Sequence, residues 1–387
     1  MTKPELPEDL VEEILCRVPA TSLKRLRSTC KRWNRLFNDD GRFARKHLDK
    51  ATKQFMVLML TNQYSIGPVS IDLSRTIPSV EVKAEYSLID PQPEYSAKLD
   101  IERVIHCDGV LLCTFWSNMS RIVVWNPLTG EQRWIRTGYR SQSGRAFNIG
   151  YCQGDNKSCN KSYRVLSCYC DIHNFEMYEF NSDTWRSLGD ICPGWRLRPH
   201  VSVSLKGSTY TFAEDETKTP PNLSLLKIDY STEKSVPVPL PCDQGIEYEE
   251  STLSVVREEK LALLSQRDEK SKTEIWVTNK IDETTKAVSW SKVLAFDMSP
   301  DLRISDFGSF LLDEEKKVLV YCDTLFEDDD YHRDIIYIVR EDNNKVIEEE
   351  FVADKVDLCS QTILNYVPSL DKIKQAKAQG KRKRGDD

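Results

Sequence analysis

One short motif returns along most of the chain at intervals of about fifty residues. In each copy a strand-like run ends in Asp or Asn, a turn with polar residues follows, and a second strand-like run begins. An Asp or Asn side chain starts such a turn by accepting hydrogen bonds from the backbone that follows it. In three copies a tryptophan comes next, at Trp134, Trp185 or Trp290. The Asp and Asn anchors are Asp72, Asn126, Asn181, Asp229, Asn279 and Asp342.

This repeat predicts an all-β architecture from about Thr52 onward. No long helices alternate with the strand-like runs, which argues against a doubly wound α/β fold. A period near fifty suits a propeller blade of about four strands, as in kelch arrays, and the tryptophan can cover the neighbouring blade. A two-sheet sandwich with irregular hairpins is the alternative, and the weak copies do not fix a blade number. The clearest strand-like runs are Ile122–Pro127, Ser162–Cys170, Phe175–Phe180, Leu205–Ala213, Glu274–Lys280 and Lys317–Cys322.

The first fifty residues have a different, helical pattern. Leu6–Trp33 contains two amphipathic runs, and Gly41–Ala51 predicts a further short helix. The first run carries Leu10, Ile14, Leu15 and Val18 along one side. The second carries Leu23, Leu26, Cys30 and Trp33 on a single face and is predicted to continue to Asp39-Asp40-Gly41. A core this small is not stable alone, so these helices need a partner surface, and a cap packed on the next domain is the alternative.

Composition excludes several classes of protein. Residues 51–370 carry a net charge of −15, which disfavours binding to nucleic acid, while the two ends are basic. The longest apolar run, Phe55–Leu60, is too short to span a bilayer, and the polar N-terminus does not look like a signal peptide. The twelve cysteines are scattered without zinc spacing, so we expect reduced, mostly buried thiols and no metal.

No motif for catalysis is present. None of the five histidines lies near a nucleophile motif, and there is no phosphate-binding loop or dinucleotide fingerprint. We therefore expect no catalytic residue and no cofactor. The alternative is a propeller enzyme of the metal-dependent oxidase kind, whose convergent ligands sequence alone could not place.

The N-terminal residues resemble an F-box over about forty positions, through Leu6-Pro7, Val18-Pro19, Ser22-Leu23 and Cys30-Lys31-Arg32-Trp33. The resemblance implies helices that dock on a Skp-family adaptor and so reach a cullin-RING ubiquitin ligase. It also implies that Cys30, Trp33 and Leu36 hold the helices together. The positions expected to face the adaptor are Leu6, Pro7, Leu10, Ile14, Leu15, Pro19, Leu23 and Leu26.

The β region resembles a plant F-box-associated domain from about residue 100 to 365. His106–Cys113 followed by Val123–Trp134 matches its start, and Gly109 and Gly207 match strand-turn glycines. The implied chain is an α+β multidomain protein: an F-box at 1–50, a β-propeller-like, kelch-like domain at 51–370, and a flexible basic tail at 371–387. The segments least like the family are expected to be loops: Arg136–Asn148, Gln153–Lys161, Phe212–Asn222 and Asp323–Asp334.

Together the two resemblances imply a non-catalytic substrate receptor of an SCF-type ubiquitin ligase, which presents an unidentified target for ubiquitination and proteasomal degradation. An adaptor-bound scaffold that causes no degradation is a further alternative. The basic run Lys381, Arg382, Lys383 and Arg384 is a possible nuclear import signal. We expect a protein of the nucleus, the cytoplasm or both, with no nucleic-acid or membrane partner.

Overall fold

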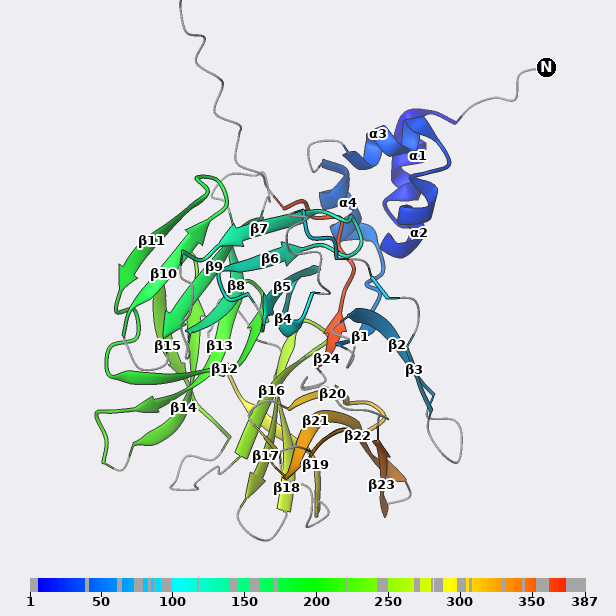
Figure 1. The fold of residues 1–387 in the computed structure, drawn as a ribbon. Coiled ribbons are helices and arrows are strands. Elements are labelled where there is room, and N and C mark those ends of the chain that lie inside the picture. Colours follow the sequence, from blue (N-terminus) through cyan, green and yellow to red (C-terminus); the bar gives the residue numbers. More distant parts are fainter. Residues whose placement is uncertain are drawn as a thin grey trace, which may run out of the picture.

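The computed structural model has a small helical unit attached to a ring of β-sheets (Figure 1). The helices are α1 Glu8–Leu15, α2 Ala20–Leu26, α3 Lys31–Asn38 and α4 Arg42–Lys50. None of the helices in the described part of the chain is long and apolar enough to cross a membrane. The structure describes residues 6–38, 42–60, 65–72, 79–82, 85–86, 88–91, 99–116, 118–138, 145–153, 161–169, 173–219, 221–241, 250–267, 272–279, 281, 288–297, 304–305, 308–328, 331–342, 345–352 and 362–373.

The described strands form six antiparallel sheets of four strands, the blades of a propeller. The first blade combines β1 Met56–Leu60, β2 Ile66–Asp72 and β3 Ser79–Val82 with β24 Ile363–Tyr366. The second has β4 Ile101–Cys107, β5 Val110–Phe115, β6 Arg121–Trp125 and β7 Gln132–Arg136. The third has β8 Arg145–Gln153, β9 Lys161–Tyr169, β10 Phe175–Glu179 and β11 Thr184–Gly189.

The remaining blades follow in chain order. The fourth has β12 Trp195–Leu205, β13 Ser208–Asp215, β14 Asn222–Asp229 and β15 Lys234–Val238. The fifth has β16 Glu250–Val256, β17 Lys260–Arg267, β18 Lys272–Thr278 and β19 Trp290–Asp297. The sixth has β20 Ser309–Asp313, β21 Val318–Asp328, β22 Tyr331–Asp342 and β23 Lys345–Val352. The predicted loop at Asp323–Asp334 is wrong, because β21 and β22 extend through most of it as a long hairpin.

The repeat seen in the sequence corresponds to one blade. Each Asp or Asn anchor lies where the third strand of its blade gives way to the fourth, as Asn126 does between β6 and β7. The predicted turn chemistry is present: Asn126 Oδ1 accepts hydrogen bonds from the backbone of Leu128 and Thr129. The tryptophans that follow do cover neighbouring blades, since Trp185 Nε1 donates to the carbonyl of Arg136 at 2.8 Å. The sandwich alternative is therefore wrong.

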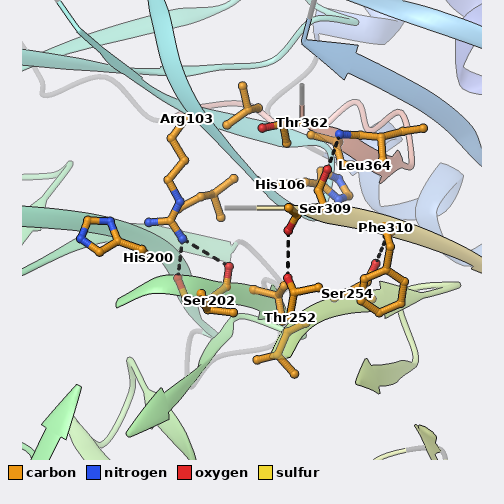
Figure 2. Close-up of a pocket in the computed structure, with 18 of the residues that line it drawn as sticks. Arg103, His106, His200, Ser202, Thr252, Ser254, Ser309, Phe310, Thr362 and Leu364 are labelled. Carbon is orange, nitrogen blue, oxygen red and sulfur yellow. Dashed lines mark hydrogen bonds between the residues drawn. The ribbon is translucent and has the colours of Figure 1, made fainter. Parts of the chain in front are cut away.

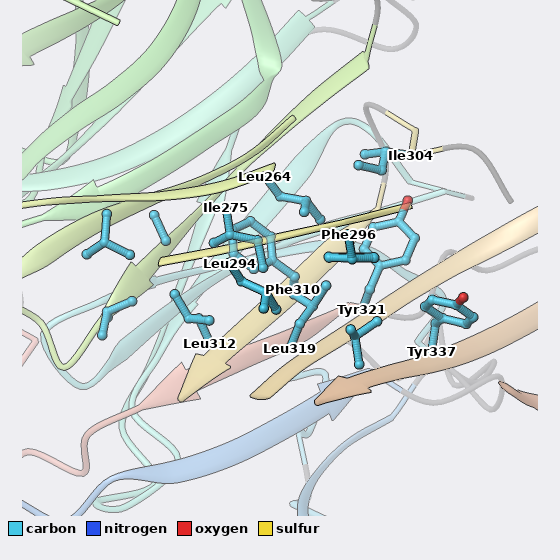
Figure 3. Packing of buried hydrophobic residues seen from close by; sticks show 14 of the residues in the cluster. Leu264, Ile275, Leu294, Phe296, Ile304, Phe310, Leu312, Leu319, Tyr321 and Tyr337 are labelled. Atoms are coloured by element: carbon cyan, nitrogen blue, oxygen red, sulfur yellow. The ribbon is translucent and has the colours of Figure 1, made fainter. Parts of the chain in front are cut away.

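The hydrophobic core of the ring lies between adjacent blades. Among the described residues of the ring, six clusters of buried side chains occur, and each joins residues of two neighbouring sheets. Figure 3 shows the cluster between the fifth and sixth blades, where Leu264 and Ile275 meet Leu319 and Tyr321. A propeller built this way needs every blade to have a neighbour on both sides, so the ring must close.

Closure pairs the two ends of the β region. Strand β24 lies against β1, with Met56 opposite Tyr366 and Met59 opposite Ile363 (Figure 1). The Tyr366 hydroxyl donates to the carbonyl of Gly109 in the second blade at 3.2 Å. The chain beyond β24 still packs on the ring, because Ile373 is buried between the second and third blades. Ordered structure therefore extends to residue 373, into the predicted tail.

The helical unit has a core of its own. Leu15, Cys16, Leu23 and Phe43 are buried together, and Trp33 and Leu36 pack against them as predicted. The predicted second amphipathic run is not one helix, because a turn at residues 27–30 separates α2 from α3. The predicted third helix is confirmed as α4.

Candidate binding surfaces

The first helix exposes an apolar ridge. Leu6 stands just before α1, and Leu10 and Ile14 follow at intervals of four residues on the same face. Leu10 is 47% exposed and Ile14 is 55% exposed. The adjoining side of α1 packs through Val11 and Leu15 on the core of the helical unit, which also includes Val18 just after the helix. The ridge formed by Leu6, Leu10 and Ile14 is therefore a surface on which another protein could pack.

The other predicted adaptor-facing residues do not all share this surface. Leu15 and Leu23 are only 4% and 1% exposed and pack inside the helical unit, and their adaptor-facing role stays a prediction. Leu26 is partly buried on the same core. Pro7 is exposed beside the ridge and Pro19 is partly buried at the start of α2.

Acidic residues of α1 fix its orientation. Glu12 is buried and forms ion pairs with Arg42 at 3.0 Å and Lys46 at 2.5 Å, which join α1 to α4. Glu13 pairs with Lys50 at 2.5 Å, and that hydrogen bond is the main cause that lowers the pKa of Glu13. These contacts hold the far side of α1 against α4, which leaves the ridge facing outward.

The helical unit attaches to the ring through its other elements. Lys24 Nζ donates to the carbonyl of Pro127, and Thr21 Oγ1 donates to Gln54 Oε1 at 2.7 Å. A cavity of about 400 Å³ lies at this junction, lined by α4, by the strand turns that follow β4, β12 and β16, and by residues 367–370. Neither Leu10 nor Ile14 takes part in the junction.

Buried charges line the junction cavity. Lys161 Nζ lies 2.9 Å from carboxylate oxygens of both Asp108 and Asp371. Glu258 lies nearby with one carboxylate oxygen 3.5 Å from Lys53 and the other 3.7 Å from His106 Nε2. Burial lowers the pKa of His106 to about 4, so its ring is neutral and Nε2 accepts a hydrogen bond from the amide of Gly109.

A second exposed apolar surface lies on the face of the ring away from the helices. The strands β4 and β12 end in turns that line the junction cavity, so the hairpin between β5 and β6 lies at the opposite face. That hairpin exposes Trp116, at 48%, and Met119. Ile89 is also exposed, on a segment that Asp90 holds to the start of β6 through an ion pair with Arg121.

The innermost strands enclose a channel next to Trp116. A cavity of about 170 Å³ lies between β4, β12, β16, β20 and β24 (Figure 2). Its lining includes Trp116 and His200. Polar side chains here join the inner strands: Thr252 Oγ1 and Ser254 Oγ donate to the carbonyls of Gly308 and Phe310 at 2.9 and 2.7 Å. Arg103 extends from β4 toward Ser202 on β12. Arg103 is not among the residues predicted from the sequence, although a charge within the apolar run of β4 is a signal for it.

The described residues offer few other groups for metal binding or thiol chemistry. Within the described ranges, no group of three His, Cys, Asp or Glu side chains is placed to hold a metal ion. The eight cysteines described are free thiols and six of them are buried. Lys381–Arg384, the possible nuclear import signal, lies outside the described residues.

Comparison with known proteins identifies both parts of the chain. Residues 56–373 match the family model described as F-box associated beta propeller domain, and residues 4–45 match the F-box domain. "F-box protein ETP2" of Arabidopsis thaliana is 55% identical over 387 residues, with 98% of each chain covered. "F-box protein ETP1" of Arabidopsis thaliana is 52% identical, with all of each chain covered. Among solved structures, "Structure of YjhT" aligns with a TM-score of 0.37 at 12% identity, covering 66% of this chain and 84% of that one.

Proposed function

The chain belongs to the F-box associated beta propeller family and carries an F-box, and from this premise we propose that it is the substrate-recognition subunit of an SCF-type cullin-RING ubiquitin ligase. The helical unit binds a Skp-family adaptor, and the propeller binds a target protein. The chain supplies no catalytic residue. It acts by proximity, because a target held beside a charged ubiquitin-conjugating enzyme presents its lysines at high effective concentration.

The observation that carries this proposal is the uncovered ridge on α1. Leu6, Leu10 and Ile14 are exposed although the same short helix buries its adjoining side. Apolar side chains in a row that the chain itself does not cover are typical of a protein interface. The core of the helical unit is too small to be stable alone, so an apolar surface left exposed on it fits a contact with a partner protein.

The target side of the proposal rests on Trp116 and Met119. Large, exposed apolar side chains next to a cavity are typical of residues that contribute most to binding energy at an interface. They lie on the face of the propeller opposite the helical unit, so adaptor and target can bind at the same time.

The adaptor proposal is tested by replacing both Leu10 and Ile14 with aspartate. A purified Skp-family adaptor should be captured by the wild-type chain and not by the double variant. The matched control is Val236→Asp, which places a charge at an exposed apolar residue of β15, far from the ridge. Equal capture by wild type and by a folded double variant would refute the proposal.

Degradation and localisation need separate tests. If the target is degraded, its half-life lengthens on proteasome inhibition only in cells that contain this chain, whereas a scaffold leaves the half-life unchanged. We also propose that Lys381–Arg384 directs part of the protein to the nucleus. A fluorescent fusion in which these four residues are alanine should then lose its nuclear fraction.

A further inference from the structure

The channel of the propeller contains a positive charge, on Arg103, that has no ion-pair partner among the described residues. Arg103 Nη2 donates to Ser202 Oγ at 2.8 Å and lies 3.5 Å from the carbonyl oxygen of Ser202 (Figure 2). The side-chain nitrogens of Arg103 form no further hydrogen bond and no ion pair with the described residues. A guanidinium has five N–H donors, so most of those of Arg103 stay available.

The neighbouring acid, Glu102, favours this charge electrostatically but forms no ion pair with it. Glu102 is the only acidic side chain among the described residues that line the cavity, and it accepts a hydrogen bond from Thr114 Oγ1 at 3.1 Å. Burial raises the pKa of Glu102 and lowers the pKa of Arg103 to about 10, so the guanidinium is still charged at neutral pH. A charge held inside a protein without a counterion is costly. An arriving anion would remove that cost.

The cavity limits what such an anion can be. Its volume of about 170 Å³ is too small for a helix, whose diameter is about 10–12 Å, but it accommodates a side chain or a chain end. The hydroxyls of Thr252 and Ser254 already donate to backbone carbonyls, whereas the guanidinium of Arg103 keeps free N–H donors and carries the positive charge. Phosphorylated segments are usually read by clusters of arginines, whereas one guanidinium suits one carboxylate through two parallel hydrogen bonds.

We propose that the channel binds a carboxylate of the target polypeptide, with Arg103 as its ion-pair partner and Trp116 in contact with an apolar residue beside it. This inference rests on the proposed function, because it names the chemistry by which the propeller selects its target. The carboxylate comes from a Glu or Asp side chain or from the C-terminus of the target.

The probe is a random heptapeptide library, prepared once with free and once with amidated C-termini, and selected on the purified full-length chain. The wild type should enrich Glu or Asp at one fixed position next to an apolar residue if a side chain enters the channel. If the C-terminus of the target enters the channel instead, peptides should be enriched only from the library with free C-termini. Binding of the best peptide should weaken at least tenfold when its acidic residue is replaced by the amide, or its end is amidated.

The variant Arg103→Gln should lose this acidic preference and should bind the best peptide at least tenfold more weakly, with its apolar preference retained. The matched control is Arg198→Gln. Arg198 lies on β12, the strand that Arg103 contacts, but it is bound to Glu214 and does not line the cavity, so this variant should leave selection unchanged. Failure to enrich any acidic peptide, or an unchanged preference in Arg103→Gln, overturns the proposal. Adaptor capture, measured on the same preparations, fails only if the proposed function fails, and it also reports that the variants are folded.

Discussion

The side-chain amide of Asn126 donates a hydrogen bond to the carbonyl of Ser369 at 2.9 Å, and so links the second blade to the segment that follows the last strand. The same nitrogen donates to the carbonyl of Asp371 at 3.0 Å, while its oxygen holds the turn that joins β6 to β7. Asn126 is completely buried. One side chain therefore supplies both a local turn and a contact that ties down the C-terminal segment.

Replacing Asn126 should be more destabilising than replacing an anchor that forms a turn only. Asn126→Ala leaves buried backbone groups without partners and should cost about 2–4 kcal/mol in the free energy of unfolding. Asn126→Asp keeps the turn but places a carboxylate against two carbonyl oxygens, so it should be no better. Asp229→Ala, which removes only the turn bonds to Ser231 and Thr232, is the control. Denaturant titration of the three variants checks this, and equal losses at the two positions would contradict it.

The buried and the exposed apolar residues of the helical unit should respond differently to substitution. Leu23→Ala and Leu15→Ala remove buried side chains and should each cost about 2–5 kcal/mol, which loosens the helical unit. Leu10→Ala and Ile14→Ala remove exposed side chains and should change stability little. Hydrogen exchange of the amides in α1–α4 distinguishes the two groups. Faster exchange in the exposed-ridge variants than in Leu23→Ala would mean that the ridge serves the fold and not a partner.

Helix α1 shows what sequence periodicity could and could not predict. It placed Leu10, Ile14 and Leu15 on one side of α1, which is right for an amphipathic helix. Neighbouring positions on such a side can still face different partners, and the packing of α4 determines that Leu15 turns inward. The periodicity of α1 contains no information about where α4 packs. The sequence alone therefore could not distinguish the exposed ridge from the buried Leu15.

The blades could be predicted from the sequence because the turns that mark them are local. An Asp or Asn turn is a local interaction between a side chain and the next few backbone amides, so each blade leaves its own mark in the sequence. The pairing of β24 with β1 leaves no such mark, because it joins the two ends of the β region. The channel is equally non-local: Arg103 and Ser202 come from different blades, and only the closed ring brings them together.

Closure of the ring should be required for a cooperative fold. A chain that ends before residue 362 lacks β24 and exposes the edge of β1, together with the clusters that contain Leu58 and Met59. We expect it to lose its sharp thermal transition and to bind a hydrophobic dye. A chain that ends after residue 373 keeps β24 and Ile373 and should melt like the full chain. A peptide of residues 362–373 added to the shortened chain should restore part of the transition, and a sharp transition without it would count against closure by β24.

The junction between helical unit and propeller should depend on pH through Glu258. Burial, assisted by the Asp108 carboxylate, raises the pKa of Glu258 to about 7 from an ordinary value of 4.5. Between these values the folded state holds a proton that the unfolded state has released, so stability is lost as pH rises through this range. The loss is complete above the folded-state pKa, and its upper limit is roughly 3 kcal/mol. Lys53 and Lys161 line the same cavity, His106 lies beside Glu258, and all three remain unchanged in the comparison that follows.

Glu258→Gln removes this titration. Relative to the wild type, the variant should gain stability between pH 5 and pH 8, measured as the difference in denaturation midpoint at each pH. The control is Glu214→Gln: a hydrogen bond from Arg196 is the main cause that lowers the pKa of Glu214, so its contribution is already complete at pH 5. That variant should be destabilised by the same amount across the range. A flat difference for Glu258→Gln as well would show that Glu258 is ionised in the folded protein throughout, with Lys53 as a sufficient counterion.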